Sequence, residues 1–178
     1  MDRRIVWVVA ALAGAVALVA ILAPFFLPAS TPPAGPAGMA GQRAPVFPLR
    51  DDAGGPASLA RYRGKVIVMN LWATWCPPCR AEMPELQRLA DVYGARGVAV
   101  VGVNQGESAQ RARAFAQSLQ IRFPIWLDDQ QQYGRVFTAL GLPTTVIVGR
   151  DGIVVRGFDG ALTFDQMRAA IAGLVAPR

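Results

Sequence analysis

The chain of 178 residues contains no histidine and only two cysteines, Cys76 and Cys79. A structural zinc site needs four ligands, so two cysteines without any histidine exclude one. The lack of histidine also argues against a copper carrier that recruits an imidazole ligand. Basic residues give a net charge of +6 but are scattered, which argues against the clustered basic face of a nucleic-acid-binding protein. We therefore expect no metal site and no nucleic-acid partner.

Charged residues are also missing between Arg4 and Arg43. Within that stretch, the apolar run from Ile5 to Ala23 would form a helix about 29 Å long, close to the thickness of a bilayer's hydrocarbon core. We expect residues 1–27 to be an uncleaved, single-pass anchor in the bacterial cytoplasmic membrane. The arginines before the run place the N-terminus inside and the rest of the chain in the periplasmic or extracytoplasmic space. A cleaved signal peptide is the alternative, although its apolar core is usually only about 7–15 residues long.

Residues 28–43 are rich in proline, glycine and alanine and are predicted to be a linker. The remainder, residues 44–178, has a length typical of one domain. Two nearly continuous apolar runs, Lys65–Trp72 and Val98–Val103, are typical of strands that are buried on both faces. A helix predicted between them, from about Pro78 to Tyr93, makes this unit a parallel crossover.

The other segments complete an α/β domain. We expect a turn at residues 51–55 and an antiparallel hairpin formed by residues 144–148 and 153–158. The last helix should bury one apolar stripe, made of Met167, Ile171, Leu174 and Val175. The remaining predictions are extended segments at 46–49 and 123–129, a brief helical segment from Ser58 to Gly64, and helices at about 108–119, 130–140 and 163–175.

The two cysteines stand where the first buried strand meets the first long helix. A disulfide across four residues closes almost no loop, so a purely structural role is a poor explanation for the pair. Cys76 falls near the N-cap of the helix, where the free amide groups and the helix dipole favour a thiolate, the nucleophile of disulfide exchange. Cys79, one turn later, could resolve a mixed disulfide. We expect a redox pair in which the Cys76 sulfur is exposed.

Three further positions bear on this chemistry. Pro77 and Pro78 contribute no amide donors to the first helical turn and should tune the reduction potential, in a direction that the sequence leaves open. Glu82 falls inside the apolar stripe of the helix. It is either a partly buried carboxylate of raised pKa that takes the proton from Cys79, or an edge residue that reaches water. Asn70 is expected to be a buried strand residue that satisfies backbone groups.

Three stretches, "GKVIVMNLWATWCPPCRAEMPEL", "LGLPTTVIVGRDG" and "APVFPLRDDAGGPASLARYRGK", resemble the thioredoxin superfamily. Within it they are most similar to membrane-anchored TlpA/ResA-like thiol–disulfide oxidoreductases with an AhpC/TSA-redoxin-like domain. The resemblance implies a thioredoxin-like fold with a central mixed sheet of four or five strands flanked by helices. It also implies an extra segment at about residues 105–133, a redox disulfide Cys76–Cys79 and no cofactor.

The resemblance also assigns roles. Cys76 would attack, Cys79 would resolve, and Glu82 matches the acidic residue that these anchored members carry. Pro143 matches a cis-proline that faces the disulfide, and Leu142 before it would offer backbone groups to a client chain. The other client-binding residues that it implies are Trp75, Pro77 and Pro78.

One departure is Asn70, which replaces the buried aspartate of general thioredoxins and leaves Glu82 as the candidate carboxylate. The resemblance implies reduction of disulfides in client proteins, for example the haem-attachment cysteines of apocytochrome c or copper-site proteins, with electrons from a transmembrane thiol donor. The "LPTT" stretch differs from the "PET" variant of dedicated cytochrome-maturation members. Three alternatives stay open: a disulfide-forming oxidant, a non-enzymatic metal or haem carrier, and a peroxiredoxin-like peroxidase, for which Thr74 is in the wrong register.

Overall fold

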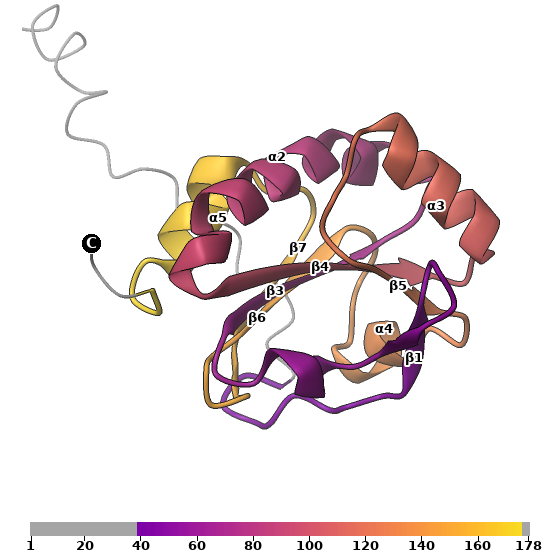
Figure 1. The fold of residues 1–178 in the computed structure, drawn as a ribbon. Helices are drawn as coiled ribbons and strands as arrows, with labels where there is room; N and C mark the ends of the chain where they lie inside the picture. Colours follow the sequence, from indigo (N-terminus) through magenta and orange to yellow (C-terminus); the bar gives the residue numbers. More distant parts are fainter. Residues whose placement is uncertain (1–38, 176–178) are drawn as a thin grey trace, which may run out of the picture. The chain divides into compact units, whose positions relative to one another are not determined.

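The computed structural model describes residues 39–175. The predicted anchor and most of the predicted linker lie outside these residues. No helix within 39–175 is both long enough and apolar enough to cross a bilayer. Figure 1 shows one central sheet, with α2, α3 and α5 on one face and α4 on the other.

The central sheet has seven strands in the order β2-β1-β5-β4-β3-β6-β7. Pairing is parallel between β3 and β4 and between β4 and β5, and antiparallel elsewhere, which confirms the mixed sheet. Two short strands that flank the expected turn extend the sheet beyond the predicted four or five strands. The strands are β1 (Leu49–Asp51), β2 (Pro56–Ala57), β3 (Val66–Trp72), β4 (Val98–Gln105), β5 (Ile125–Asp128), β6 (Thr144–Val148) and β7 (Val154–Asp159).

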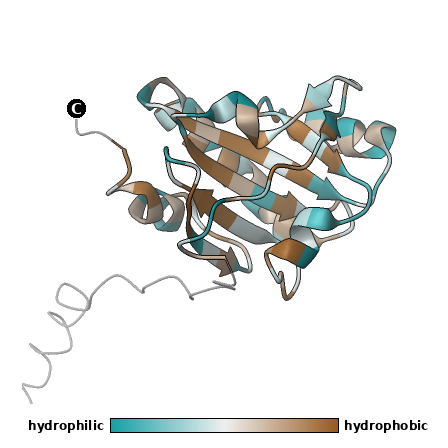
Figure 2. Cartoon of the chain, turned by 90° about the horizontal axis from the view of Figure 1, so that it is seen from below, coloured by the Kyte–Doolittle hydropathy of each residue, from teal (hydrophilic) through white to brown (hydrophobic). Residues whose placement is uncertain are grey.

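The two central strands are largely apolar because helices or loops cover both of their faces. Every residue of β3 and β4 is buried. Along β3, Val68 and Trp72 face the side of α2, whereas Met69 and Leu71 contribute to the core on the other side. Asn70 shares the α2 side because side chains alternate along a strand. Figure 2 shows these hydrophobic strands between more hydrophilic helices and loops.

The helices are α2 (Pro77–Tyr93), α3 (Ala109–Ser118), α4 (Gln132–Val136) and α5 (Phe164–Ile171), with short 3-10 helices η1 (Leu59–Tyr62) and η2 (Gly94–Arg96). The helix predicted at 130–140 is therefore too long. It begins late because Gln131 has a left-handed backbone and the Asp128 carboxylate accepts hydrogen bonds from the first two backbone N–H groups of α4. Thr138, also left-handed, prevents its continuation.

The last helix is also shorter than the predicted 163–175. Thr163 and Gln166 form a capping box at its start, as sequences of this kind favour. The helix ends at Ile171, two residues before Gly173, a poor helix former. Met167, Ile171 and Val175 are buried as expected, but Leu174 is only partly buried.

The end of the predicted linker is hydrogen-bonded to the domain. Gly41 N–H donates to Val154 O at 2.9 Å, and Val154 N–H donates to Gln42 O at 2.8 Å. Ala44 N–H donates to Gly152 O at 2.9 Å. The chain therefore joins the domain beside the turn between β6 and β7.

Candidate active site

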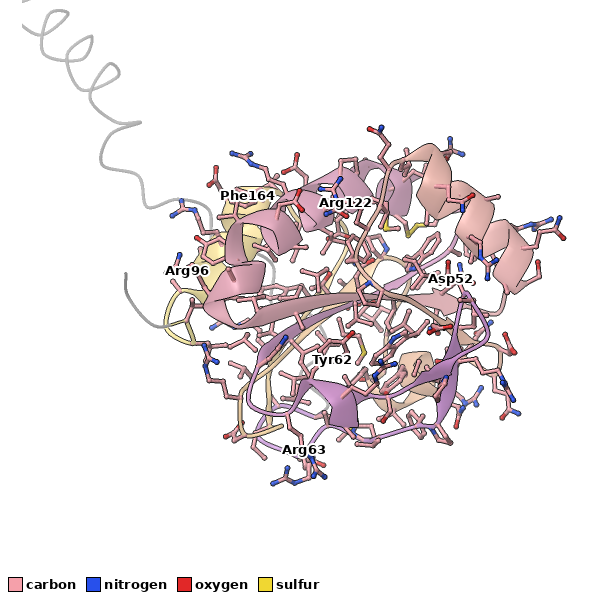
Figure 3. All side chains as sticks on the ribbon, viewed as in Figure 1. Asp52, Tyr62, Arg63, Arg96, Arg122 and Phe164 are labelled. Carbon is pink, nitrogen blue, oxygen red and sulfur yellow. A yellow bond between two sulfur atoms is a disulfide. The ribbon has the colours of Figure 1, made fainter. Side chains whose placement is uncertain are left out.

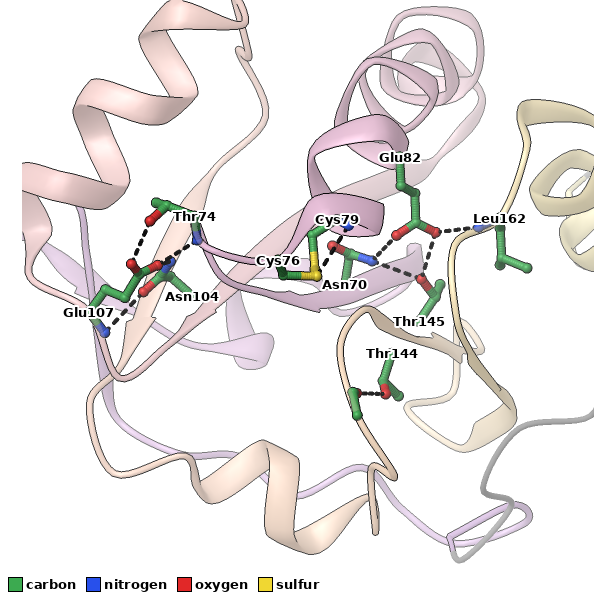
Figure 4. The surroundings of a disulfide bond; sticks show 11 residues. Asn70, Thr74, Cys76, Cys79, Glu82, Asn104, Glu107, Thr144, Thr145 and Leu162 are labelled. Atoms are coloured by element: carbon green, nitrogen blue, oxygen red, sulfur yellow. Dashed lines mark hydrogen bonds between the residues drawn. A yellow bond between two sulfur atoms is a disulfide. The ribbon is translucent and has the colours of Figure 1, made fainter.

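The two cysteines form a disulfide at the start of α2, seen as a yellow bond in Figure 3. Cys76 is the N-cap residue with an extended backbone, and its sulfur accepts the Cys79 N–H at 3.2 Å (Figure 4). Pro77 and Pro78 fill the first two helical positions and have no N–H to donate. The predicted pair and its place at the strand–helix junction are confirmed, and the helix begins one residue earlier than expected.

The expected exposure of the Cys76 sulfur is contradicted in this disulfide form. Cys76 is 2% exposed and Cys79 is 1% exposed. The Cys76 side chain turns inward, because it is bonded to Cys79 and accepts its amide, and it packs in the same apolar cluster as Trp72. Trp75, in contrast, is 67% exposed. The most accessible side chain beside the disulfide is therefore an aromatic ring.

Glu82 is buried, with 1% of its surface exposed, so the interior alternative is the one observed. Its Oε2 accepts the side-chain amide of Asn70 at 2.8 Å. Its Oε1 accepts Leu162 N–H at 2.8 Å and the Thr145 hydroxyl at 3.5 Å. Burial raises the pKa of Glu82 to about 7, and the hydrogen bonds from these three residues oppose that rise only in part.

Asn70 does not satisfy backbone groups as predicted. Its Nδ2 donates to the Glu82 carboxylate and, at 2.9 Å, to the Thr145 hydroxyl, because the strand places it under α2 (Figure 4). Its Oδ1 is buried and has no hydrogen-bond partner among the residues described. Rotation of the amide would bring this acceptor to Glu82 when the carboxyl is protonated. Asn70 can thus serve either protonation state of Glu82.

The segment before β6 lies beside the end of β3, because Thr144 pairs with Leu71. The Leu142–Pro143 peptide bond is cis, and Pro143 is buried. Within residues 39–175, neither backbone group of Leu142 has a hydrogen-bond partner. Leu142 and Trp75 both line a hollow of about 440 Å³ next to α4. The predicted client-binding residues Trp75 and Leu142 are therefore brought together.

Sequence reasoning missed a second carboxylate near the cysteines. Glu107 accepts hydrogen bonds from the backbone N–H and hydroxyl of Thr74, at 2.7 and 2.6 Å, and from Asn104 at 2.8 Å. Burial alone would raise the pKa of Glu107, but these hydrogen bonds and the charge of Arg111 outweigh it and lower the pKa. The strand order could have revealed the contact, since the carboxyl ends of the parallel strands β3 and β4 meet at one edge.

Replacing Glu107 with alanine is expected to loosen the loop that leads to Cys76. The change removes three hydrogen bonds to a carboxylate, and we expect the free energy of unfolding to fall by about 2–4 kcal/mol. Urea unfolding of the oxidised protein measures the loss. Arg111→Ala breaks only the exposed ion pair to Glu107, at 3.7 Å, and should cost less than about 1 kcal/mol. An equal loss in both variants would contradict the assignment.

Within residues 39–175, the Cys79 N–H is the one amide that donates to the Cys76 sulfur, and this gives a prediction for Pro77 and Pro78. Pro78→Ala supplies an N–H at the second helical position, where it can donate to an N-cap side chain. A hydrogen bond to a charged group contributes about 1.5–3 kcal/mol, and 30 mV corresponds to about 1.4 kcal/mol. The reduction potential should rise by about 30–60 mV in a glutathione titration. Pro77→Ala adds its N–H one position earlier and should shift the potential less; the reverse order would refute this account.

Comparison with known proteins agrees with this site. Residues 40–156 match the AhpC/TSA family. The thiol-disulfide oxidoreductase ResA of Geobacillus thermodenitrificans is 36% identical over 128 residues, which cover 72% of this chain and 74% of the relative. ResA of Bacillus subtilis is 35% identical over 123 residues, 69% of each chain.

Solved structures extend the likeness to the fold. A putative thiol:disulfide interchange protein DsbE from Chlorobium tepidum has a TM-score of 0.70 at 29% identity, covering 76% of this chain and 97% of that one. StoA from Bacillus subtilis has a TM-score of 0.61 at 25% identity, covering 70% and 95%. The chain therefore belongs to the AhpC/TSA family, with a thioredoxin-like fold, and is a ResA-like thiol–disulfide oxidoreductase.

Proposed function

We propose that the chain is a membrane-tethered reductant of client-protein disulfides on the outer side of the bacterial cytoplasmic membrane. The observation that carries the reducing direction is the helix N-terminus, where, among the residues that the structure describes, only the Cys79 N–H donates to the Cys76 sulfur. Because few donors stabilise the Cys76 thiolate, the reduced form is less stable and gives up its electrons more readily.

The reaction is a pair of sulfur exchanges. The Cys76 thiolate attacks a client disulfide, forms a mixed disulfide and releases one client thiolate. Cys79 then loses its proton and attacks the Cys76 sulfur, which closes the Cys76–Cys79 disulfide and releases the second client thiolate. Two electrons pass to the client, and a transmembrane thiol donor restores the dithiol.

Glu82 supports the second exchange as a general base. Cys79 lies one turn before it on the same helix, and both are buried on its inner face. A carboxyl with a pKa of about 7 can accept a proton and release it near neutral pH. No other carboxylate within residues 39–175 makes hydrogen bonds in this network, which supports Glu82 as the base.

Client contact would begin at Trp75 and Leu142. An extended client segment can pair with the free backbone groups of Leu142 as an added strand while its apolar side chain rests on the Trp75 ring. Binding of this kind depends on hydrogen bonds to the client's backbone, so it suits flexible segments that contain a disulfide. The haem-attachment cysteines of apocytochrome c and the cysteines of copper-site proteins are clients of that kind.

The tether is supported by the apolar run from Ile5 to Ala23 and by the arginines before it. Deleting residues 1–28 is expected to move the protein from the membrane fraction to the soluble fraction, with its redox activity retained. Fractionation and a disulfide-reduction assay measure the two effects. An insoluble or inactive product would contradict the proposed division of the chain.

The reduction potential of the Cys76–Cys79 couple tests the direction. A value near that of thioredoxin, about −270 mV, would support the reductant, whereas a value near −120 mV, as for a strong oxidant, would overturn it. A second experiment mixes the reduced protein with a peptide that contains a Cys-x-x-Cys disulfide and measures the reduction of that peptide. Reduction of the peptide is expected, and an unchanged peptide would count against the proposal.

A further inference from the structure

A second hollow lies at the other end of β3 from the disulfide. It has a volume of about 260 Å³ and is bounded by η1, the start of β3 and the turn between β6 and β7. At about 3.3 Å per residue, the length of β3 separates it from the disulfide by roughly 20 Å. No residue assigned above to disulfide exchange lines it. Thiol chemistry therefore does not account for this hollow.

The floor of the hollow is apolar and its rim is basic. Leu59, Ile67 and Val148 contribute buried apolar side chains, and Arg43, Arg63 and Arg150 also line it. Asp151 is the one acidic lining residue, and its carboxylate accepts the nearby backbone N–H of Ile153 at 3.0 Å. The hollow thus combines an apolar surface with positive charge, as a binding site for an anionic amphiphile does.

The rim arginines, Arg43, Arg63 and Arg150, are not paired with carboxylates within residues 39–175. Arg43 donates to the carbonyl oxygen of Asp151 at 3.0 Å. Arg150 donates to the carbonyl oxygens of Gly64, Arg96 and Leu174 at 2.8, 3.3 and 3.3 Å, so both arginines contact neutral groups. Arg63 lies at the lower edge of the molecule in Figure 3. Arg43 and Arg63 therefore offer N–H donors to a phosphate diester, and Arg150, whose three nitrogens already donate to carbonyls, adds its positive charge.

The chain enters the domain beside the same hollow. Gly41 and Ala44 are hydrogen-bonded to Val154 and Gly152, next to the turn that lines the hollow. The segment before them carries the predicted membrane anchor. An anionic phospholipid is therefore the amphiphile that the predicted tether would bring nearest to these arginines.

We propose that this hollow binds an anionic phospholipid, with the phosphate on the rim formed by Arg43, Arg63 and Arg150 and an acyl chain on the apolar floor. The bound lipid would hold this end of the sheet against the membrane surface. The Cys76–Cys79 disulfide, at the opposite end of β3, would then lie on the side of the domain away from the bilayer. The site does not depend on the direction of the redox reaction.

The test uses the full chain in a neutral detergent with short-chain lipids as probes. Dihexanoyl phosphatidylglycerol, added below its critical micelle concentration, is expected to bind at one equivalent in a calorimetric titration. Dihexanoyl phosphatidylcholine should bind at least tenfold more weakly, and equal binding of the two would overturn the proposal. Glycerol phosphate, which lacks acyl chains, should also bind at least tenfold more weakly. Equal binding would show that the ligand of this hollow is a free phosphate ester and not a lipid.

Two variants and a matched control locate the site. Arg63→Glu reverses one rim charge, and Ala60→Phe fills part of the hollow without changing charge. Each should weaken binding of the anionic lipid at least tenfold and leave disulfide reduction unchanged, which shows that the domain is folded. Arg113→Glu makes the same charge change on α3, where Arg113 pairs with Asp52 at 3.6 Å, and should bind normally. Equal binding by Arg63→Glu and Arg113→Glu would refute the site.

Discussion

Changing Cys79 to serine is expected to turn the enzyme into a covalent trap for its clients. Cys76 can still attack a client disulfide, but no second thiol is left to break the mixed disulfide that forms. Turnover should fall to the uncatalysed level while a stable adduct accumulates. A disulfide-containing peptide reveals this by mass spectrometry, because the protein gains the mass of one peptide and loses it again on treatment with dithiothreitol.

The reciprocal change, Cys76→Ser, is the matched control. It leaves Cys79, which lies within the first turn of α2 and, unlike Cys76, does not occupy the N-cap position that favours a thiolate, so this thiol should form little or no adduct. Both variants also lack the disulfide, so a difference between them reports the roles of the two sulfurs. Adduct formation by Cys76→Ser but not by Cys79→Ser would reverse the assigned roles.

The parts of this site that sequence reasoning identified are those that local periodicity determines. Cys76 is the N-cap because a buried strand ends shortly before it and prolines occupy the first helical turn. Glu82 is buried because it follows Cys79 by three residues, which brings both to the inner face of one helix. Strand β3 is recognisable because all of its residues except Asn70 are apolar, as is typical of a strand covered on both faces.

The parts that were missed depend on contacts between distant segments. The partners of Glu82 include Thr145 and the Leu162 amide, 63 and 80 residues away along the chain, and no periodic pattern encodes those distances. The burial of Cys76 likewise depends on the tertiary packing around its sulfur. Helix α4 is short because Gln131 has a positive φ, a backbone conformation that a glutamine does not predict.

Replacing Glu82 with glutamine is expected to slow the resolution of the mixed disulfide by about 100-fold, the usual contribution of a general base. In the wild type, the rate of this step should rise with pH and level off above about 7, as Glu82 loses its proton. The variant has no such group, so its inflection near pH 7 should vanish. Single-turnover kinetics from pH 5 to 8 measure both effects, and an unchanged profile would exclude Glu82 as the base.

Asn70 provides an internal control for this profile. Asn70→Ala removes a hydrogen bond that favours the charged carboxylate, so the pKa of Glu82 and the inflection of the rate should both move upward. The rate above the inflection should stay near that of the wild type, because the base is still present. A uniform loss of rate at every pH would instead indicate that Asn70 only supports the fold.

The same carboxylate should make stability depend on pH in the oxidised protein, in which neither cysteine titrates. Glu82 has a pKa of about 7 in the folded state against 4.5 as its ordinary value, so the folded state binds more protons between these pH values. The free energy of unfolding must therefore fall as pH rises through this window, by up to about 3 kcal/mol, and the loss should disappear in Glu82→Gln.

The composition of the chain makes this window unusually clear. There is no histidine. The pKa of Glu107 is lowered, so the stability that its carboxylate contributes is lost only as the pH falls below 4.5. The raised pKa values of Tyr62 and Tyr133 lie above 10. Between pH 5 and 7, a difference in urea unfolding between wild type and Glu82→Gln therefore reports the buried carboxylate itself. Parallel pH profiles for the two proteins would show that Glu82 is already charged throughout this range and holds no proton to exchange.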